Sequence, residues 1–365
     1  MAKHYNSKVR HRDFKVGDLA FLKAWNDTCN AGTGEPTMLI PRKQFFLRPT
    51  TFSGPCKSHL LGGLLAPDGP KEWKEFNDVV KFIEFESVTG LHITGVGLIN
   101  GRGKGWWDIS CRDHPKLLTL RFHNSNDIHM SQLKIVNSPQ IHVLLLGCNG
   151  VELQDLSIIS SGVSPNTDGI HIHQSNHIFI NNSFIGVGDD CVSIGDEITD
   201  VNITHVNCGP GHGISIGSLG LDGTVSNVSN IHARHIIFNG TQNGARIKTY
   251  QTGRGQVQNI EFTDVTFIDA GNPIIIDQHY CGAPNACPPT KVGVKISNVL
   301  YSAMHGTSTS DVALNFNCSE NVACTDIKLN NIDLTSSTRG EKVSSSCNNA
   351  FGEAIGTVNP KSCLR

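Results

Sequence analysis

Apolar and polar residues alternate in short segments that recur along most of the chain. One eight-residue pattern, apolar–x–apolar–x–small or polar–x–x–apolar, occurs nine times, beginning at Leu91, Ile128, Val151, Ile178, Val201, Ile231, Ile260, Val294 and Ile327. A period of two predicts a strand with one buried face rather than a helix. Turn residues follow each copy, and a second short strand such as GIHIHQ or GISIGS often comes next.

Repeated strands predict a solenoid, because one unit cannot bury its apolar face alone and stacked units can. The copies start 23 to 37 residues apart, which is too irregular for a propeller. We therefore predict an all-β fold, a right-handed single-stranded parallel β-helix, with a β-sandwich as the alternative. The segment Phe21–Cys29 is expected to form a short helix that caps the N-terminal end.

Net charge and cysteine content indicate which binding partners and which cellular compartment to expect. The net charge of −2 gives no basis for binding nucleic acid or an anionic membrane surface. Twelve cysteines without a C-x-x-C pair indicate disulfides of an oxidising, extracellular compartment rather than zinc sites. We expect the pairs Cys191–Cys208, Cys318–Cys324 and Cys347–Cys363, and six N-x-S/T sequons agree with secretion.

Residues 1–17 differ from the rest of the chain. They are basic and lack the apolar region of a signal peptide. A transmembrane helix is not predicted either, because the sequence holds no run of roughly 18 apolar residues. We expect residues 1–17 to be disordered or the product of a misjoined gene, and residues 18–365 to form one β-helix catalytic domain.

Four polar motifs accompany the apolar pattern: NTDGIHI from Asn166, GDDCVSIG from Gly188, GHGISIGS from Gly211 and RIK from Arg246. Asp168 and Asp190 are 22 residues apart, as are Asp190 and His212. If the local coil has that length, these side chains occupy one position on successive rungs, about 4.8 Å apart. Alternation around Ile247 sends Arg246 and Lys248 to the same outer face. By the same rule His171, Ser193 and Ser215 point outward.

Carboxylates gathered on one face indicate proton-transfer chemistry. Like charges at short range push pKa values apart, and glycosidases obtain an acid and a base from one residue type in this way. Each motif alone has a simpler interpretation, since NTDG and GDD are common turns, GDD also suits a cation ligand, and a histidine between glycines is common at surfaces. The shared register favours a functional site, because turns have no reason to align Asp, His, Arg and Lys.

In order and spacing these motifs resemble those of glycoside hydrolase family 28, the polygalacturonases, from about residue 18 to the end. GRGKGWW from Gly101, GNPIIIDQHYC from Gly271 and FSGPCKS from Phe52 add to the resemblance, which is greatest to the plant branch with its pollen-type exopolygalacturonases. The resemblance implies a pectin-lyase-like solenoid. It also implies inverting hydrolysis of α-1,4-galacturonosyl linkages in polygalacturonate (pectin) of the cell wall, with exo action favoured over endo.

The resemblance further implies roles for single residues. Asp189 holds the general-acid position and is expected to face solvent, Asp168 and Asp190 hold and activate water, and His212 tunes the acid. The positions implied for substrate binding are Asn166, Arg246, Lys248 and Tyr280. No metal or other cofactor is expected, and the enzyme is expected to be a monomer.

Two other functions remain open. A calcium-dependent pectate lyase would share fold and substrate, with Asp189 and Asp190 as calcium ligands, but His212 and the lack of another acidic residue on the next rung disfavour it. A non-catalytic pectin-binding β-helix would not need three aspartates. Rung spacing itself conflicts with inversion, because carboxylates one rung apart should lie nearer the ~5–5.5 Å of retaining glycosidases than the ~6.5–9.5 Å of inverting ones.

Overall fold

The computed structural model describes residues 20–30, 37–54, 59–73, 81–108, 117–281 and 290–365, so the basic segment of residues 1–17 lies outside it. The chain divides into two compact units, Met1–His171 with Ile178–Gly188 and Ile172–His177 with Asp189–Arg365. Each unit is a stack of parallel strands, and each is described by itself. None of the described helices is long and apolar enough to cross a membrane.

The first unit begins with helical segments and short strands. Its helices are α2 (Ala20–Cys29), α3 (Gly69–Trp73) and α4 (Lys104–Trp107). Its strands are β1 (Thr37–Phe46), β2 (Thr50–Ser53), β3 (His59–Leu65), β4 (Lys81–Glu86), β5 (Thr89–Thr94), β6 (Leu98–Asn100), β7 (Leu118–His123), β8 (Asn126–Ser131), β9 (Lys134–Val136), β10 (Val143–Leu146), β11 (Asn149–Gln154) and β12 (Ser157–Ile159). The division between the units passes through β13 (Ile170–His173) and β14 (Asn176–Gly186).

The second unit contains the remaining strands, of which β20 is the longest with 17 residues. They are β15 (Val192–Ile194), β16 (Ile198–Cys208), β17 (Ile214–Leu219), β18 (Val225–Asn239), β19 (Asn243–Tyr250), β20 (Arg254–Ala270), β21 (Asn272–Tyr280), β22 (Lys295–Ser308), β23 (Val312–Asn317), β24 (Cys324–Ser336), β25 (Ser344–Asn348) and β26 (Ala350–Asn359), with a 3-10 turn, η1 (Leu221–Gly223). One sheet has the order β16–β18–β20–β22–β24–β26, and the other has β15–β17–β19–β21–β23–β25.

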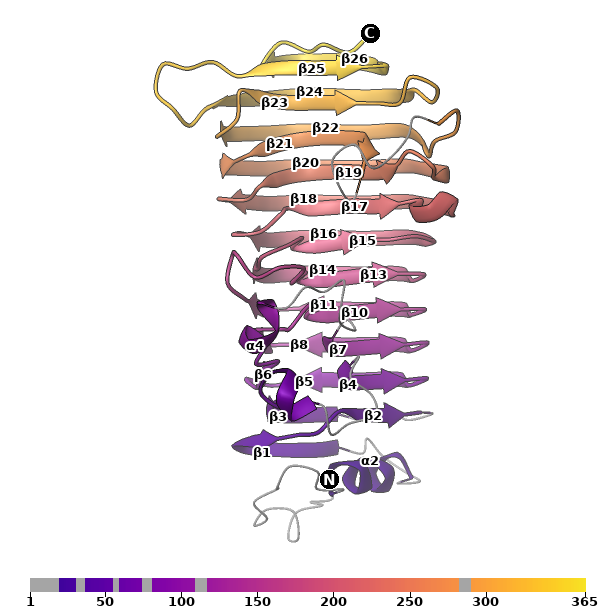
Figure 1. The fold of residues 1–365 in the computed structure, drawn as a ribbon, viewed down its shortest axis with the longest axis vertical. Helices are drawn as coiled ribbons and strands as arrows, with labels where there is room; N and C mark the ends of the chain where they lie inside the picture. The colour runs from indigo at the N-terminus through magenta and orange to yellow at the C-terminus, as the bar shows by residue number, and fades with distance from the viewer. Residues whose placement is uncertain (1–19, 31–36, 55–58, 74–80, 109–116, 282–289) are drawn as a thin grey trace. The chain divides into compact units, whose positions relative to one another are not determined.

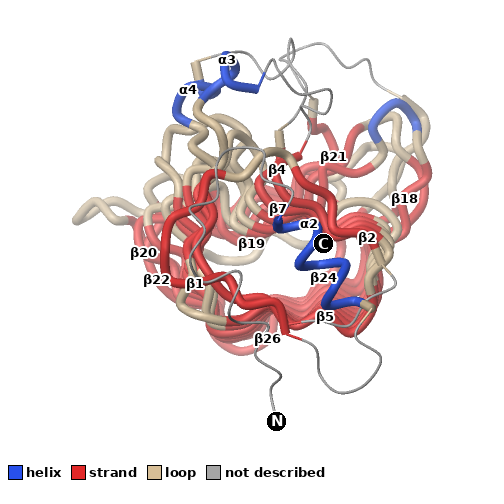
Figure 2. The backbone as a smooth tube through the Cα atoms, turned by 90° about the horizontal axis from the view of Figure 1, so that it is seen from below, coloured by secondary structure: helices blue, strands red, loops and turns tan. Residues whose placement is uncertain are grey.

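In the first unit one sheet has the order β11–β8–β5–β3–β6–β9–β12, with β1 on β3, and the other has β2–β4–β7–β10. Within each unit Figure 1 shows the strands as successive rungs, and Figure 2 shows loops joining them at the corners. The pairing of β18 with β20 is typical in being parallel and in register over most of its length. The fold is a right-handed parallel β-helix, as predicted.

The polar fifth position of the repeat is a corner of the coil. His235 in β18 and Asp264 in β20 hold positive φ angles of 55° and 54° there, which short polar side chains tolerate better than branched ones. The copy placed at Val294 is wrong by five residues, because β20 pairs Ile260 with Val299. Both frames alternate in that segment, so the apolar pattern alone did not distinguish them.

The predicted capping helix is confirmed as α2. Its apolar face buries Trp25, whose ring centroid lies 5.2 Å from that of Phe52 and 5.6 Å from that of Phe85. The indole Nε1 donates to the carbonyl of Ser53 at 3.0 Å, so its polar atom is also satisfied. Phe85 stacks in turn on Phe122 at 5.5 Å. The helix therefore continues the aromatic stack of the core, with a gain of about 0.5–1.5 kcal/mol per ring pair beyond burial.

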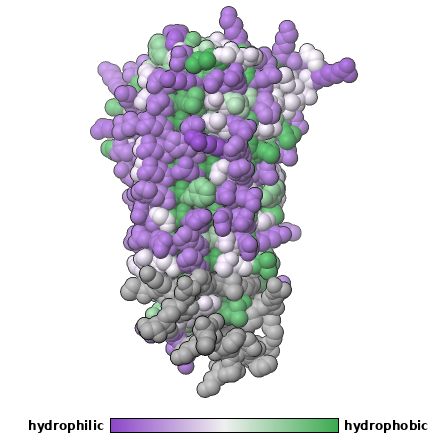
Figure 3. Space-filling model, turned by 180° about the vertical axis from the view of Figure 1, so that it is seen from behind, coloured by the Kyte–Doolittle hydropathy of each residue, from purple (hydrophilic) through white to green (hydrophobic). Residues whose placement is uncertain are grey.

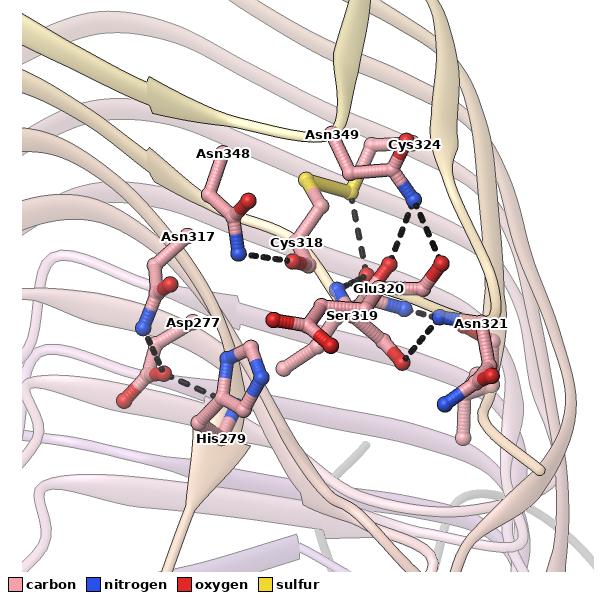
Figure 4. The surroundings of a disulfide bond; sticks show 12 residues. Asp277, His279, Asn317, Cys318, Ser319, Glu320, Asn321, Cys324, Asn348 and Asn349 are labelled. Carbon is pink, nitrogen blue, oxygen red and sulfur yellow. Dashed lines mark hydrogen bonds between the residues drawn. A yellow bond between two sulfur atoms is a disulfide. The ribbon is translucent and has the colours of Figure 1, made fainter. Parts of the chain in front are cut away.

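The three expected disulfides are present: Cys191–Cys208, Cys318–Cys324 and Cys347–Cys363. Figure 4 shows how asparagines fix the backbone around Cys318–Cys324. Asn348 donates to the carbonyl of Cys318 at 2.9 Å, and Asn349 donates to that of Ser319 at 2.6 Å. On the face drawn in Figure 3, hydrophilic side chains predominate, with hydrophobic ones between them.

Candidate active site

Strands β15, β17 and β19 bring part of the predicted site together in the second unit. Ser193 pairs with Ser215, and Ser215 pairs with Arg246, while Ile214 and Ile216 beside Ser215 are fully buried in the core. The outward direction of Ser193 and Ser215 follows the predicted alternation. Both are nevertheless covered, being 2% and 0% exposed, and Ser215 is covered by the charged side chains that it binds.

Asp189 and His212 form a hydrogen-bonded pair at the turns that precede β15 and β17. Nδ1 of His212 lies 3.0 Å from Oδ1 of Asp189, and the N–H of His212 donates to the carbonyl of Asp189 at 2.8 Å. The N–H of Asp190 donates to the same Oδ1 at 2.8 Å. The side chain of Asp189 is only 17% exposed. Asp189 is therefore partly exposed, less than predicted, and the imidazole of His212 lies against it.

These contacts set the charge of Asp189. Burial raises its pKa, but the hydrogen bond and charge of His212, the charge of Lys248 and the N–H of Asp190 together outweigh burial. The net effect holds the pKa of Asp189 below its ordinary value. Asp189 is therefore ionised in the protein without substrate over most of the pH range.

Asp190 lies at the centre of a buried ion-pair network. Its Oδ1 accepts from Nη2 of Arg246 at 2.6 Å and from the hydroxyl of Ser215 at 2.8 Å, and its Oδ2 accepts from Nζ of Lys248 at 2.9 Å. The side chain of Asp190 is 2% exposed, and those of Arg246 and Lys248 are 12% and 9% exposed. The sequence predicted that Arg246 and Lys248 lie beside the carboxylates on the outer face. In the structure both cations bind one of these carboxylates, Asp190.

Tyr280 joins this network through Lys248. Nζ of Lys248 lies 5.3 Å from the centroid of the Tyr280 ring, within the range of a cation–π contact. Tyr250 meets Tyr280 edge-to-face with 5.2 Å between ring centroids. Lys248 is therefore fixed by a carboxylate and an aromatic ring together, and Tyr280 takes part in the site by contact with Lys248.

Asp168 and Asn166 are the predicted site residues that belong to the first unit. The Asp168 side chain is 16% exposed, and its Oδ2 lies 4.0 Å from Nδ1 of His171. Asn166 has a φ of 54°, a backbone conformation that asparagine tolerates well. Both lie in the loop that leads into β13, as the motif predicted.

Two glycines of the motifs are required by close backbone approach. A Cβ on Gly188 would lie 2.0 Å from the carbonyl oxygen of Ser164, and one on Gly213, where φ is 90°, would lie 2.3 Å from that of Asn243. The N–H of Gly188 also donates to Oγ1 of Thr167 at 3.0 Å. These contacts fix the chain immediately before Asp168, Asp189 and strand β17.

Among the described residues, the ligand atoms of Asp189, Asp190 and His212 lie within 4.8 Å of one another, a spacing that could suit a metal ion. The donor set does not fit calcium, which takes six to eight oxygen ligands. Both oxygens of Asp190 already bind cationic side chains. A divalent ion there would face the charges of Arg246 and Lys248.

Two residues complete the site that were not among the predicted catalytic and binding residues, although the sequence predicted an outward direction for Ser215. Ser215 donates to Asp190 and accepts from Nε of Arg246 at 2.8 Å. Asn243, 4% exposed, donates to the carbonyl of His212 at 3.3 Å. The signal for Ser215 was this outward direction, because it places a polar side chain on the column that Arg246 continues.

Comparison with known proteins gives a consistent result. The family model "Glycosyl hydrolases family 28" matches residues 29–363. A polygalacturonase of Prunus persica is 40% identical over 355 residues, which cover 94% of this chain and 88% of that protein. An exopolygalacturonase of Thermotoga maritima has the same fold, with a TM-score of 0.79 at 17% identity over 95% of this chain and 89% of its own.

Endopolygalacturonase I of Stereum purpureum, solved with two galacturonate molecules, also shares the fold, with a TM-score of 0.70 at 19% identity over 91% of this chain and 97% of its own. The fold is therefore common to exo- and endo-acting enzymes. The family match extends over nearly the whole chain. The chain belongs to glycosyl hydrolases family 28 and is a glycoside hydrolase.

Proposed function

We propose that this enzyme hydrolyses α-1,4-galacturonosyl linkages in polygalacturonate, with Asp189 as the general acid. The observation that carries the proposal is the Asp189–His212 hydrogen bond of 3.0 Å beside Asp190, which two cations hold. Proton donation by a positioned carboxyl group is the step that glycoside hydrolysis requires at the leaving oxygen. Asp168 is the third carboxylate of the proposal, on the basis of its 22-residue spacing from Asp190.

The charges in the second unit suit an anionic sugar. Two carboxylates, Asp189 and Asp190, are balanced by Arg246 and Lys248, so the site does not repel galacturonate although the chain has a net charge of −2. A guanidinium has five N–H donors and an ammonium three, and the contacts with Ser215 and Asp190 use only some of them. The remaining donors can bind the substrate carboxylate while the network stays intact.

The same arrangement favours an inverting mechanism. A carboxylate has about four acceptor positions, and three of those of Asp190 are occupied by Ser215, Arg246 and Lys248. Such a carboxylate is a poor nucleophile, because two cations draw on its electrons, but its remaining position can accept from a water molecule. Asp190 therefore orients a water molecule, and this water rather than the carboxylate attacks the sugar.

Protonation of Asp189 needs the substrate. Binding of galacturonate adds a negative charge near Asp189 and displaces water, and both changes raise the pKa of a carboxyl group. We therefore infer that the fraction of active enzyme increases as the pH falls from neutral. His212 tunes this step through its hydrogen bond.

Nuclear magnetic resonance of the first product formed from polygalacturonate tests the mechanism. Inversion gives the β-anomer initially, and the α-anomer as first product would refute the role of Asp190. Chelation by EDTA separates this proposal from the calcium-dependent lyase. A lyase would lose activity and its product would absorb ultraviolet light, whereas a hydrolase keeps its activity and its product does not absorb.

We further propose exo action, as in the pollen-type branch that the motifs resemble. A time course of product sizes tests this proposal. Free galacturonate from the start indicates exo action, and a ladder of oligogalacturonates indicates endo action. The disulfides are typical of a protein that functions in an oxidising compartment. We propose that the enzyme is extracellular, in the plant cell wall, and that it is a monomer. Fractionation of the native tissue and light scattering of the purified enzyme test these two points.

A further inference from the structure

His142 lies in the first unit, immediately before β10, and it is completely buried. Its backbone N–H and its side-chain Nδ1 both contact the carbonyl oxygen of Asp168, at 2.9 and 2.8 Å. Its Nε2 lies 2.8 Å from the hydroxyl of Ser160. Ser160 begins the loop that follows β12, and Asp168 lies near the end of that loop. The imidazole thus connects the two ends of the loop that carries the NTDG motif.

The partners determine the tautomer of this ring. A carbonyl oxygen only accepts, so Nδ1 of His142 carries the hydrogen and Nε2 is left as an acceptor. Nε2 then accepts from the Ser160 hydroxyl, and the N–H of Ser138 at 3.4 Å points to the same atom. Burial lowers the pKa of His142 to about 4, although the carbonyl groups of Asp168 and Ile159 act in the opposite direction. The ring is neutral and both of its nitrogens are satisfied.

We propose that His142 is a positioning residue for Asp168, which it holds by donating a hydrogen bond from Nδ1 to the Asp168 carbonyl. This inference rests on the proposed catalytic role of Asp168. The side-chain donor matters because two hydrogen bonds restrict the direction of the Asp168 carbonyl more than one does, and small displacements of a catalytic group reduce turnover strongly. Fixing the peptide of Asp168 fixes the origin of its side chain, whereas the binding residues Arg246 and Lys248 lie on other strands.

Two conservative variants test the role of each nitrogen. Asparagine places its amide near the position of Nδ1, and glutamine places its amide near that of Nε2. We expect His142→Asn to keep kcat on polygalacturonate within about threefold of the wild type. His142→Gln should lower kcat about tenfold or more, with KM changed less than twofold, because positioning acts on the chemical step.

The control for the other contact is Ser160→Ala, which removes the partner of Nε2 and leaves the bond to Asp168. We expect its kcat to stay within about threefold of the wild type. Equal kcat values for His142→Asn and His142→Gln, at whatever level, would overturn the proposal, as would a loss confined to KM.

A double-variant cycle separates this inference from the proposed function. In an Asp168→Asn background, His142→Gln should cause no further loss, because residues that act as a unit are not additive. An additional tenfold loss in that background would show that His142 acts elsewhere. If Asp168→Asn alone keeps full activity, the catalytic role of Asp168 is refuted, and the positioning role falls with it.

Discussion

Replacement of Lys248 by methionine tests the buried network directly. The variant keeps the apolar stem and removes the ammonium that lies 2.9 Å from Oδ2 of Asp190. Loss of one partner from a buried ion pair costs about 3–5 kcal/mol when the other charge is left alone. Asp190 keeps Arg246 and Ser215, so we expect a smaller loss of about 2–3 kcal/mol in the free energy of unfolding, within the range of a charged hydrogen bond.

Urea denaturation of the variant measures this loss, and Lys328→Met is the matched control. The side chain of Lys328 is 41% exposed and lies 3.9 Å from Asp326 and 3.8 Å from Glu353, so its removal should cost about 0–1 kcal/mol. In steady-state kinetics, Lys248→Met should lose much activity on polygalacturonate and less on highly methyl-esterified pectin. Equal stability of the Lys248 and Lys328 variants would show that the network does not hold Asp190.

Three further predictions concern single side chains. Asp189→Asn should lower kcat about 10²–10⁴-fold, and turnover above a tenth of the wild-type value would remove Asp189 from the mechanism. Unfolding free energy should fall by about 3 kcal/mol as the pH drops from 6.5 to about 4, because unfolded His142 takes up a proton before the folded one does. Urea midpoints across that range should show the fall in the wild type and not in His142→Asn. Tyr301→Phe should stabilise the fold by about 1–3 kcal/mol, since no described residue bonds its buried hydroxyl; a lower melting temperature in this variant would contradict that assignment.

The sequence predicted the fold because a solenoid repeats one physical requirement on each rung. Every inward position has to be apolar, so the alternation of Ile214 and Ile216 with Ser215 can be read directly from the amino-acid sequence. The helical cap was also predictable, because Phe21, Trp25 and Thr28 are spaced to share the buried face of one helix. The Val294 copy shows where this reasoning fails, since a segment that alternates in two frames does not define its own register.

The ion-pair network was not predictable from alternation. Alternation gives the direction in which a side chain leaves a strand, but not how far a long side chain reaches along the face. Arg246 and Lys248 bind Asp190 across 56 and 58 residues of sequence, and the coil that leads to them is longer than the 22 residues between Asp190 and His212. Their burial follows from this reach, because a cation that binds a carboxylate on another rung lies flat over the sheet.

The corners of the coil explain why spacing predicted the chemistry but not the mode of cleavage. In the second unit the corners that precede β17, β19 and β21 have nearly constant lengths when they are counted between residues that pair on neighbouring rungs. They are then residues 209–213, 239–244 and 268–273, and they include end residues of the flanking strands. Counted in the same way, the corners that follow β15 and β17 differ in length, with residues 195–197 between Ile194 and Ile198 and residues 217–227 between Ile216 and Val228. His212 lies in one of the corners of nearly constant length. The number of residues between Asp190 and His212 therefore indicates where His212 lies on its rung. Residues added in the variable corners change the loops at the other end of the same strands, where they can close or open a groove without moving the acid. Exo and endo enzymes can therefore share one catalytic spacing and one fold.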